Sequence, residues 1–173
     1  MKELILGGIR SGKSRLAEQR AQDSGLELVY VATARADGDE ELSERIHRHR
    51  ERRSAVWTVV EEPLALAATL EAEAAAHRCV LVECLTLWLT NLLCSEEPAL
   101  FARERAAFMR ILPRLTGRVI LVSNETGLGV VPMGVLSRRF VDESGTLHQW
   151  LAASCDRVIL TVAGLPQAVK GTL

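Results

Sequence analysis

Short, continuous apolar runs alternate with longer amphipathic stretches along this chain. Apolar runs that predict buried strands cover residues 4–6, 28–32, 56–60, 80–82, 119–123 and 158–162. Stretches with helical periodicity cover residues 13–23, 40–52, 64–76, 85–93, 100–115 and 135–153. Strands that are apolar throughout and alternate with helices are typical of a mostly parallel sheet covered on both faces. The pattern therefore predicts a single α/β domain over residues 1–173.

The turn after the first apolar run carries a phosphate-binding motif. It reads G-G-I-R-S-G-K-S and matches G-x-x-x-x-G-K-S between a strand and a helix. Gly7 and Gly12 allow the backbone to direct its N–H groups at phosphate oxygens. Lys13 would contact the β- and γ-phosphates, and the Ser14 hydroxyl would hold Mg²⁺. The predicted site for a nucleoside triphosphate consists of Gly7, Gly8, Ile9, Arg10, Ser11, Gly12, Lys13 and Ser14.

Polar residues that follow other strands are further candidates, because ligands of open α/β sheets bind outside the carboxyl ends of the strands. Glu83 closes a buried run, where a carboxylate near Mg²⁺ commonly accompanies a P-loop; we favour this role over an exposed carboxylate. Of Glu61 and Glu62, one could reach the site while the other caps the next helix. Thr33 and Arg35 fit a phosphate contact and a solvated loop equally well.

The loop after residues 119–123 is open to two interpretations. It begins with Asn124 and Glu125 and contains Gly127 and Gly129. Two glycines so close together fit backbone that approaches a ligand, and they equally fit an ordinary connection.

Two histidines lie in a basic segment with helical periodicity, residues 43–53. At about 100° per residue, His49 falls near the apolar stripe of Leu42 and Ile46, whereas His47 lies on roughly the opposite side. An inward histidine among arginines is a candidate nucleophile toward phosphorus. A structural histidine or a patch that binds nucleic acid are the alternatives.

Charge and composition exclude several classes of protein. The formal net charge is −1 at pH 7, which argues against a nucleic-acid partner. No apolar run is long enough to span a membrane, and no basic-plus-apolar leader precedes the first strand. Four cysteines without C-x-x-C spacing favour free thiols over a metal site or disulfides. Because free thiols persist in a reducing compartment, we expect a cytoplasmic protein.

Five segments of the chain carry a resemblance to one family. They are the P-loop at 7–14, R-I-H-R-H-R at 45–50 with the Trp57 and Glu61-Glu62-Pro63 that follow, V-E-C-L-T-L-W-L-T-N at 82–91, S-N-E-T-G-L-G-V-V-P at 123–132 and V-A-G-L-P at 162–166. Many families share the P-loop, whereas the other four segments in this order are specific. Together they resemble the bifunctional adenosylcobinamide kinase/adenosylcobinamide-phosphate guanylyltransferase family of cobalamin biosynthesis, over nearly the whole chain.

The resemblance implies a RecA-like P-loop fold and two reactions. First, ATP or GTP phosphorylates the aminopropanol hydroxyl of adenosylcobinamide. Then GTP guanylylates a histidine, and the GMP passes to adenosylcobinamide phosphate to give adenosylcobinamide-GDP. The family's nucleophile corresponds to His49, in agreement with its helical phase, and Lys13 is the second catalytic residue. The resemblance also implies homotrimers, in which neighbouring subunits would complete the corrinoid site.

The resemblance extends to individual positions beyond the P-loop. The family's nucleotide contacts correspond to Thr33, Ala34, Arg35, Arg50, Glu51, Arg52, Arg53, Glu61 and Glu83, and Ser14 and Glu83 are the expected Mg²⁺ ligands. Three positions depart from the family: Ser54 stands where proline is common, Val141 where arginine is common, and His148 where asparagine is common. These departures concern contact details and leave the reaction class unchanged.

Two other functions remain open at this stage. One is a P-loop kinase of another small hydroxylated metabolite, with His49 in a structural role. The other is a nucleotide-gated module that binds nucleic acid through residues 45–53, which the balanced net charge disfavours.

Overall fold

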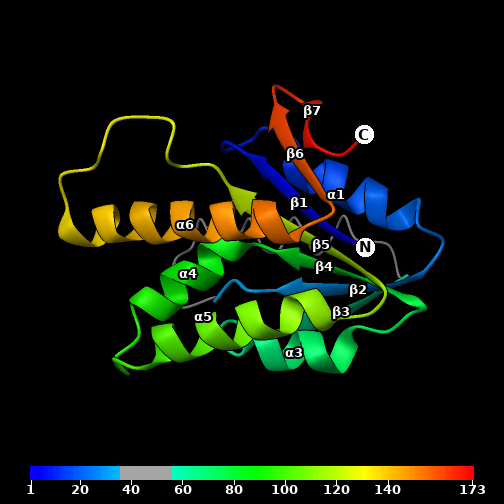
Figure 1. Cartoon of the computed structure of the whole chain (residues 1–173), viewed down its shortest axis with the longest axis horizontal. Helices are drawn as coiled ribbons and strands as arrows, with labels where there is room; N and C mark the ends of the chain where they lie inside the picture. The colour runs from blue at the N-terminus through cyan, green and yellow to red at the C-terminus, as the bar shows by residue number, and fades with distance from the viewer. Residues whose placement is uncertain (36–55) are drawn as a thin grey trace.

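A seven-stranded sheet forms the centre of the molecule, in the strand order β3-β2-β4-β5-β1-β6-β7 (Figure 1). The computed structural model describes residues 1–35 and 56–173. The strands are β1 (Lys2–Gly7), β2 (Glu27–Ala32), β3 (Trp57–Glu61), β4 (Arg78–Glu83), β5 (Arg118–Asn124), β6 (Arg157–Val162) and β7 (Leu165–Lys170). All neighbours pair in parallel except β6 and β7, which are antiparallel. The prediction of a mostly parallel sheet is confirmed.

Helices cover both faces of the sheet, as the sequence predicts (Figure 1). They are α1 (Lys13–Gln22), α3 (Leu66–Glu73), α4 (Leu85–Leu93), α5 (Leu100–Ile111) and α6 (Val135–Ser154), with a 3₁₀ turn η1 (Leu112–Arg114) after α5. Side chains alternate between the faces along each strand. In β1, Leu4 belongs to the core under α3–α6, whereas Ile5 belongs to the core under α1. The helix predicted at 40–52 lies outside the described residues.

Strand β7 was absent from the sequence prediction. Its side chains are mostly exposed, so no run of buried residues marks it. It also contains Pro166, which an edge strand tolerates because one side of its backbone needs no partner. The turn that joins it to β6 uses Ala163 and Gly164, both with positive φ, at 50° and 83°. Such turns match the twist of an antiparallel pair.

Two helices are shorter than predicted, for local reasons. The stretch predicted at 64–76 is helical only over Leu66–Glu73, because the Glu62 carboxylate accepts hydrogen bonds from the backbone N–H groups of Leu64 and Ala65, at 2.8 and 2.7 Å. These bonds cap a turn that precedes α3. The stretch predicted at 100–115 leaves the α-helix at Ile111, and η1 follows with Pro113, which cannot continue α-helical hydrogen bonding.

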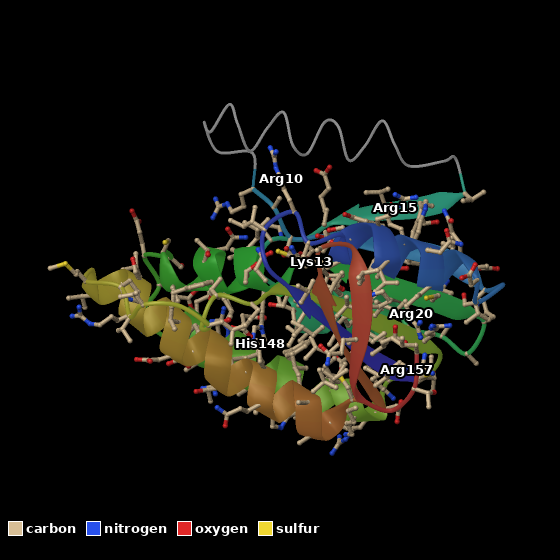
Figure 2. The ribbon with its side chains drawn as sticks, turned by 90° about the horizontal axis from the view of Figure 1, so that it is seen from above. Arg10, Lys13, Arg15, Arg20, His148 and Arg157 are labelled. Carbon is tan, nitrogen blue, oxygen red and sulfur yellow. The ribbon has the colours of Figure 1, made fainter. Side chains whose placement is uncertain are left out.

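A buried carboxylate joins three elements at the amino-terminal edge of the sheet. Glu3 of β1 is fully buried. It accepts hydrogen bonds from Arg20 at the end of α1, from Arg118 Nη2 of β5 at 3.4 Å and from Arg157 Nη1 of β6 at 3.1 Å. Figure 2 shows Arg20 and Arg157 close together and away from Lys13. One carboxylate thus holds α1, β5 and β6 against β1.

Candidate active site

The P-loop lies between β1 and α1, at the carboxyl edge of the sheet, as predicted. Gly12 has φ of 92° and serves as the N-cap of α1, and Arg10 also has a left-handed backbone, with φ of 57°. Left-handed backbone in consecutive turns directs N–H groups into one concave surface that suits anions. The amino end of α1 adds the positive end of its dipole. The backbone of residues 7–14 therefore forms a loop of the kind that binds phosphate.

The predicted P-loop lysine and the two predicted metal ligands meet at this loop. Ser14 Oγ donates a hydrogen bond of 2.8 Å to Glu83 Oε1, at the end of β4. Lys13 is only 8% exposed, and its Nζ donates to the Gly8 carbonyl at 3.2 Å. Mg²⁺ commonly takes one or two oxygen ligands from the protein and the rest from phosphates and water. The hydroxyl and carboxylate therefore fit the magnesium site expected from the sequence.

The end of β2 is bonded to the end of β4 through Thr33. Its hydroxyl accepts from the backbone N–H of Cys84 at 2.9 Å and donates to the Cys84 carbonyl at 2.8 Å, while its own N–H donates to Glu83 O at 3.0 Å. This side chain is fully buried and holds the strand that carries Glu83. Nucleotide contacts by Thr33, Ala34 and Arg35 stay predictions.

Asn91 of α4 is a supporting residue that sequence reasoning missed. Its Nδ2 donates to Thr33 O at 2.7 Å and to Pro63 O at 3.1 Å. The amide therefore joins the segments that follow β2 and β3. The signal was present, because Asn91 ends the specific segment at 82–91, but a single sequence does not reveal a bond between residues so far apart.

The structure separates the two glutamates at the end of β3. Glu62 is the helix-capping residue, as described above, and Glu61 is the last, exposed residue of the strand. Because β2, β4 and β5 lie between β3 and the P-loop strand, Glu61 stands far along the sheet edge from Lys13. Its nucleotide contact stays a prediction. His49, Arg50, Glu51, Arg52 and Arg53 lie outside the described residues.

The β6–β7 turn packs on the P-loop, which the sequence did not predict. Gly164 N donates to the Ser11 carbonyl at 2.9 Å. A Cβ on Gly12 would lie 3.2 Å from Gly164 Cα, and one on Gly7 would clash with the Ser11 hydroxyl and approach Thr161 O to 2.7 Å. This contact gives the segment V-A-G-L-P at 162–166 a structural role, because its turn packs against the P-loop and supports it.

A polar cluster surrounds His148 beside the P-loop. His148 Nε2 lies 2.8 Å from Ser123 Oγ at the end of β5, and Nδ1 lies 3.8 Å from Glu125 Oε2. Burial lowers the pKa of His148, and the neighbouring Glu125 carboxylate opposes this shift. The imidazole is therefore neutral at pH 7. The sequence singled out His148 only as a departure from the family, because nothing in it places α6 against the end of β5.

Metal and membrane features are limited in the described parts of the chain. Within residues 1–35 and 56–173, no three His, Cys, Asp or Glu side chains gather as a metal-binding group. None of the helices in these ranges has the length and apolar character needed to cross a membrane.

Fold and site together define a P-loop NTPase of the RecA-like class. Among solved structures, the RadB recombinase has a TM-score of 0.51 and 15% identity, covering 92% of this chain and 73% of that chain; this likeness concerns the fold alone. The family model described as cobinamide kinase / cobinamide phosphate guanyltransferase matches residues 3–169. The chain belongs to this family.

Two curated relatives can be aligned with this chain over nearly their full length. The chain is 63% identical over 171 residues to the bifunctional adenosylcobalamin biosynthesis protein CobP of Pseudomonas aeruginosa, covering 99% of this chain and 98% of the relative. It is 36% identical over 180 residues to the bifunctional adenosylcobalamin biosynthesis protein CobU of Escherichia coli, covering 96% and 98%. The resemblance stated from the sequence is confirmed.

Proposed function

We propose that this protein phosphorylates adenosylcobinamide with ATP or GTP and then transfers GMP from GTP to adenosylcobinamide phosphate, giving adenosylcobinamide-GDP. The substrate rests on the family match over residues 3–169. The chemistry rests on one observation in the structure, the Ser14–Glu83 hydrogen bond next to Lys13 in the P-loop. This arrangement can hold a triphosphate for attack at either the γ- or the α-phosphorus.

In the kinase step, the P-loop positions the triphosphate and the acceptor hydroxyl attacks the γ-phosphorus. The O–Pγ bond forms, the bond from Pγ to the β,γ-bridging oxygen breaks, and the nucleoside diphosphate leaves. Lys13 neutralises charge on the β- and γ-phosphates. Ser14 and Glu83 would hold Mg²⁺, which supplies further neutralisation of the phosphate oxygens when bound.

In the guanylyl-transfer step, His49 attacks the α-phosphorus of GTP and releases pyrophosphate. The GMP bound through nitrogen then passes to a phosphate oxygen of adenosylcobinamide phosphate, which regenerates the histidine. A covalent intermediate divides one difficult transfer into two easier ones. Arg50, Glu51, Arg52 and Arg53, which follow His49, and Thr33, Ala34, Arg35 and Glu61 are the further proposed nucleotide contacts.

Labelling with α-labelled GTP and Mg²⁺ tests the histidine directly. We expect a protein-bound label that acid removes and base does not, as a phosphoramidate requires. His49→Ala should abolish this label, whereas His47→Ala, two residues away in the sequence, should retain it. A wild-type protein that takes no label would contradict the guanylyl-transfer half of the proposal, and an equal loss in both variants would contradict the assignment to His49.

The homotrimer is the proposed assembly. It is supported by large apolar side chains on the segment between β5 and α6, where Leu128, Val130 and Met133 are 84%, 96% and 94% exposed. Single exposed apolar residues are ordinary, but a group of them marks a contact surface. Val130→Asp should convert trimers to monomers in light scattering coupled to size exclusion, and a wild-type monomer would contradict the proposal.

The cytoplasm is the proposed compartment. All four cysteines are free thiols, and Cys79, Cys84 and Cys155 are buried. Thiols that stay unpaired are the rule in reducing compartments. Cell fractionation tests this placement, and recovery outside the cytoplasm would contradict it.

A further inference from the structure

The loop that follows β5 begins between the P-loop and Glu83, one of the two proposed magnesium ligands. In the sheet, β5 lies between β4 and β1. Glu83 at the end of β4 is in register with Val122, and Gly7 at the end of β1 is in register with Asn124. The residues immediately after Asn124 therefore emerge between the two parts that hold the triphosphate.

Glu125 is attached to the first residue of the P-loop. Its backbone N–H donates to the Gly7 carbonyl at 3.0 Å. Lys13 Nζ donates to the carbonyl of the next residue, Gly8, at 3.2 Å. Consecutive Cα atoms are about 3.8 Å apart, so Glu125 and the lysine ammonium are bonded to neighbouring peptide groups. The residue that follows β5 thus lies beside the first residues of the P-loop, next to the peptide group that the Lys13 ammonium contacts.

The carboxylate of Glu125 is hydrogen-bonded on one side and faces His148 on the other. Oε1 accepts the backbone N–H of Gly127 at 2.6 Å, and Oε2 lies 3.8 Å from His148 Nδ1. Because the imidazole is neutral, the Ser123 hydroxyl is assigned as the donor to Nε2, which leaves the Nδ1 proton directed at Glu125. Ser123 is fully buried, whereas the Glu125 side chain is 21% exposed. Of these groups, the carboxylate is the one that a substrate can reach.

The other glutamates at this edge of the described structure have different contacts. Glu83 bonds Ser14, where both would hold magnesium. Glu62 caps the turn before α3. Glu61 ends β3, three strands further from β1 than β5 is. Within residues 1–35 and 56–173, Glu125 is therefore the best-placed carboxylate beside the P-loop to act on an acceptor.

We propose that Glu125 is the general base of the phosphoryl-transfer step, an inference that rests on the proposed function. The acceptor oxygen bonds to the γ-phosphorus as the nucleoside diphosphate departs, and the hydroxyl proton moves to the Glu125 carboxylate. A carboxylate has the same task in protein kinases, where it accepts the proton of the substrate hydroxyl. His148 is a positioning residue that orients this carboxylate. Guanylylation of a histidine has no acceptor hydroxyl, so this step does not need Glu125.

The test compares the two transfers in one protein. Glu125→Gln keeps the shape of the side chain and an oxygen that can accept the Gly127 N–H. We measure phosphorylation of adenosylcobinamide by ATP, and separately pyrophosphate release from GTP with adenosylcobinamide phosphate supplied. The ratio of the kinase kcat to the guanylyl-transfer kcat should fall roughly 100-fold, the contribution typical of a general base. Glu96→Gln, an exposed carboxylate before α5, is the matched control and should leave the ratio unchanged.

Chemical rescue separates a base from a structural contact. Glu125→Ala should show a similarly low kinase rate, and added formate should restore it roughly tenfold, since a small carboxylate can occupy the vacated space and accept the proton. Formate should leave the rate of Lys13→Ala unchanged.

Each outcome decides the proposal. A Glu125→Gln protein with its kinase rate within about threefold of wild type, or with both rates reduced in proportion, overturns the role of Glu125 as a base. The absence of rescue by formate also counts against it. These results would leave the two-step function intact. A wild-type protein that carries out neither transfer would instead contradict the proposed function itself.

Discussion

A fully buried carboxylate, Glu3, and a half-buried carboxylate, Glu83, lie at opposite edges of the same sheet in different surroundings. Glu3, at the amino edge, is enclosed by Arg20, Arg118 and Arg157. Glu83, at the carboxyl edge, bonds the Ser14 hydroxyl, and the nearby Lys13 ammonium is bonded to a backbone carbonyl. At the amino edge, three arginine side chains bond one carboxylate. At the carboxyl edge, the Lys13 ammonium bonds the Gly8 carbonyl and the Glu83 carboxylate bonds the Ser14 hydroxyl.

The difference follows from what each edge has to hold. At the amino edge, Arg20, Arg118 and Arg157 all bond the Glu3 carboxylate, and these bonds stabilise the junction of α1, β1, β5 and β6. At the carboxyl edge, a direct bond between lysine and glutamate would have to be broken before phosphate could bind. Ligation of a polyanion and its metal requires groups whose present bonds are weak enough to exchange. Stability is concentrated at one end of the strands and chemistry at the other.

The largest expected effect is on stability, at the amino edge. Glu3→Gln leaves three guanidinium groups without their carboxylate, and loss of one partner of a buried ionic group costs about 3–5 kcal/mol. Urea unfolding should show this loss, whereas kcat of the remaining folded protein should stay near that of wild type. Glu27→Gln is the control at the same edge, since its side chain is 68% exposed and such pairs contribute about 0–1 kcal/mol. Equal losses in both variants would contradict the special role of Glu3.

The second effect is on catalysis, at the carboxyl edge. Lys13→Ala should lower kcat of both transfers by roughly 100- to 1000-fold, as removal of a positioned charge does. The free energy of unfolding should change little, because the ammonium makes one bond to a carbonyl. Arg15→Ala, at an exposed position two residues further into α1, is the control and should leave the kcat of both transfers unchanged. Steady-state kinetics of the two variants measure the difference. A Lys13→Ala protein that is unstable but active would reverse the assignment of the two edges.

The third effect tests how tightly the P-loop is packed. Gly7→Ala places a methyl group against Ser11 and Thr161, and overpacking of this kind costs about 1–3 kcal/mol. Because the loop that moves is the one that binds phosphate, we expect a nucleotide Kd raised about tenfold, equivalent to about 1.4 kcal/mol. Gly145→Ala is the control, since a Cβ there meets nothing within 4 Å. Calorimetric titration measures the nucleotide Kd. Equal Kd values for Gly7→Ala and Gly145→Ala would contradict the tight packing around Gly7.

The smallest effect is the pH dependence contributed by His148. Because burial lowers its pKa in the folded state, the unfolded chain binds this proton at a higher pH than the folded protein does. Stability from this group is present above the unfolded pKa, near 6.5, and is lost as pH falls below it, with a slope of at most about 1.4 kcal/mol per pH unit. Unfolding of His148→Asn, measured from pH 7.5 to 5, should lack this component. Parallel curves for both proteins would contradict it.

The sequence predicts the sheet well because its inner strands are buried on both faces. Residues 28–32 and 119–122 form continuous runs without a charged residue, and they lie within β2 and β5. It fails at β7, where exposure removes the pattern and Pro166 argues against a strand. The sequence also predicts the ends of α3 and α5 wrongly. The Glu62 carboxylate accepts hydrogen bonds from two following N–H groups, so Glu62 is the capping residue of the two adjacent glutamates. Composition alone left this open.

The candidate site divides in the same way. The P-loop and Glu83 were predicted, because strand ends converge at one edge and a motif with fixed spacing marks the phosphate position. Three other features depend on contacts between residues 23 to 153 positions apart in the sequence: the bonds of Asn91, the packing of Gly164 on the P-loop, and the His148–Glu125 cluster. Periodicity describes a single helix or strand, so it carries no information about such pairs.

The β6–β7 turn also has a consequence for synthesis of the chain. Strand β1 is made first, yet its two neighbours in the sheet are β5 and β6, and the turn that supports Ser11 and Gly12 ends at Gly164. A ribosome-bound chain that has completed β4 therefore carries a P-loop strand with neither neighbour in place. Because pairing between strands far apart in the sequence is slow, we expect the P-loop to reach its final packing only after β5, β6 and the turn at Gly164 have been made. The packing of residues 7–14 thus depends on a turn about 150 residues later in the sequence.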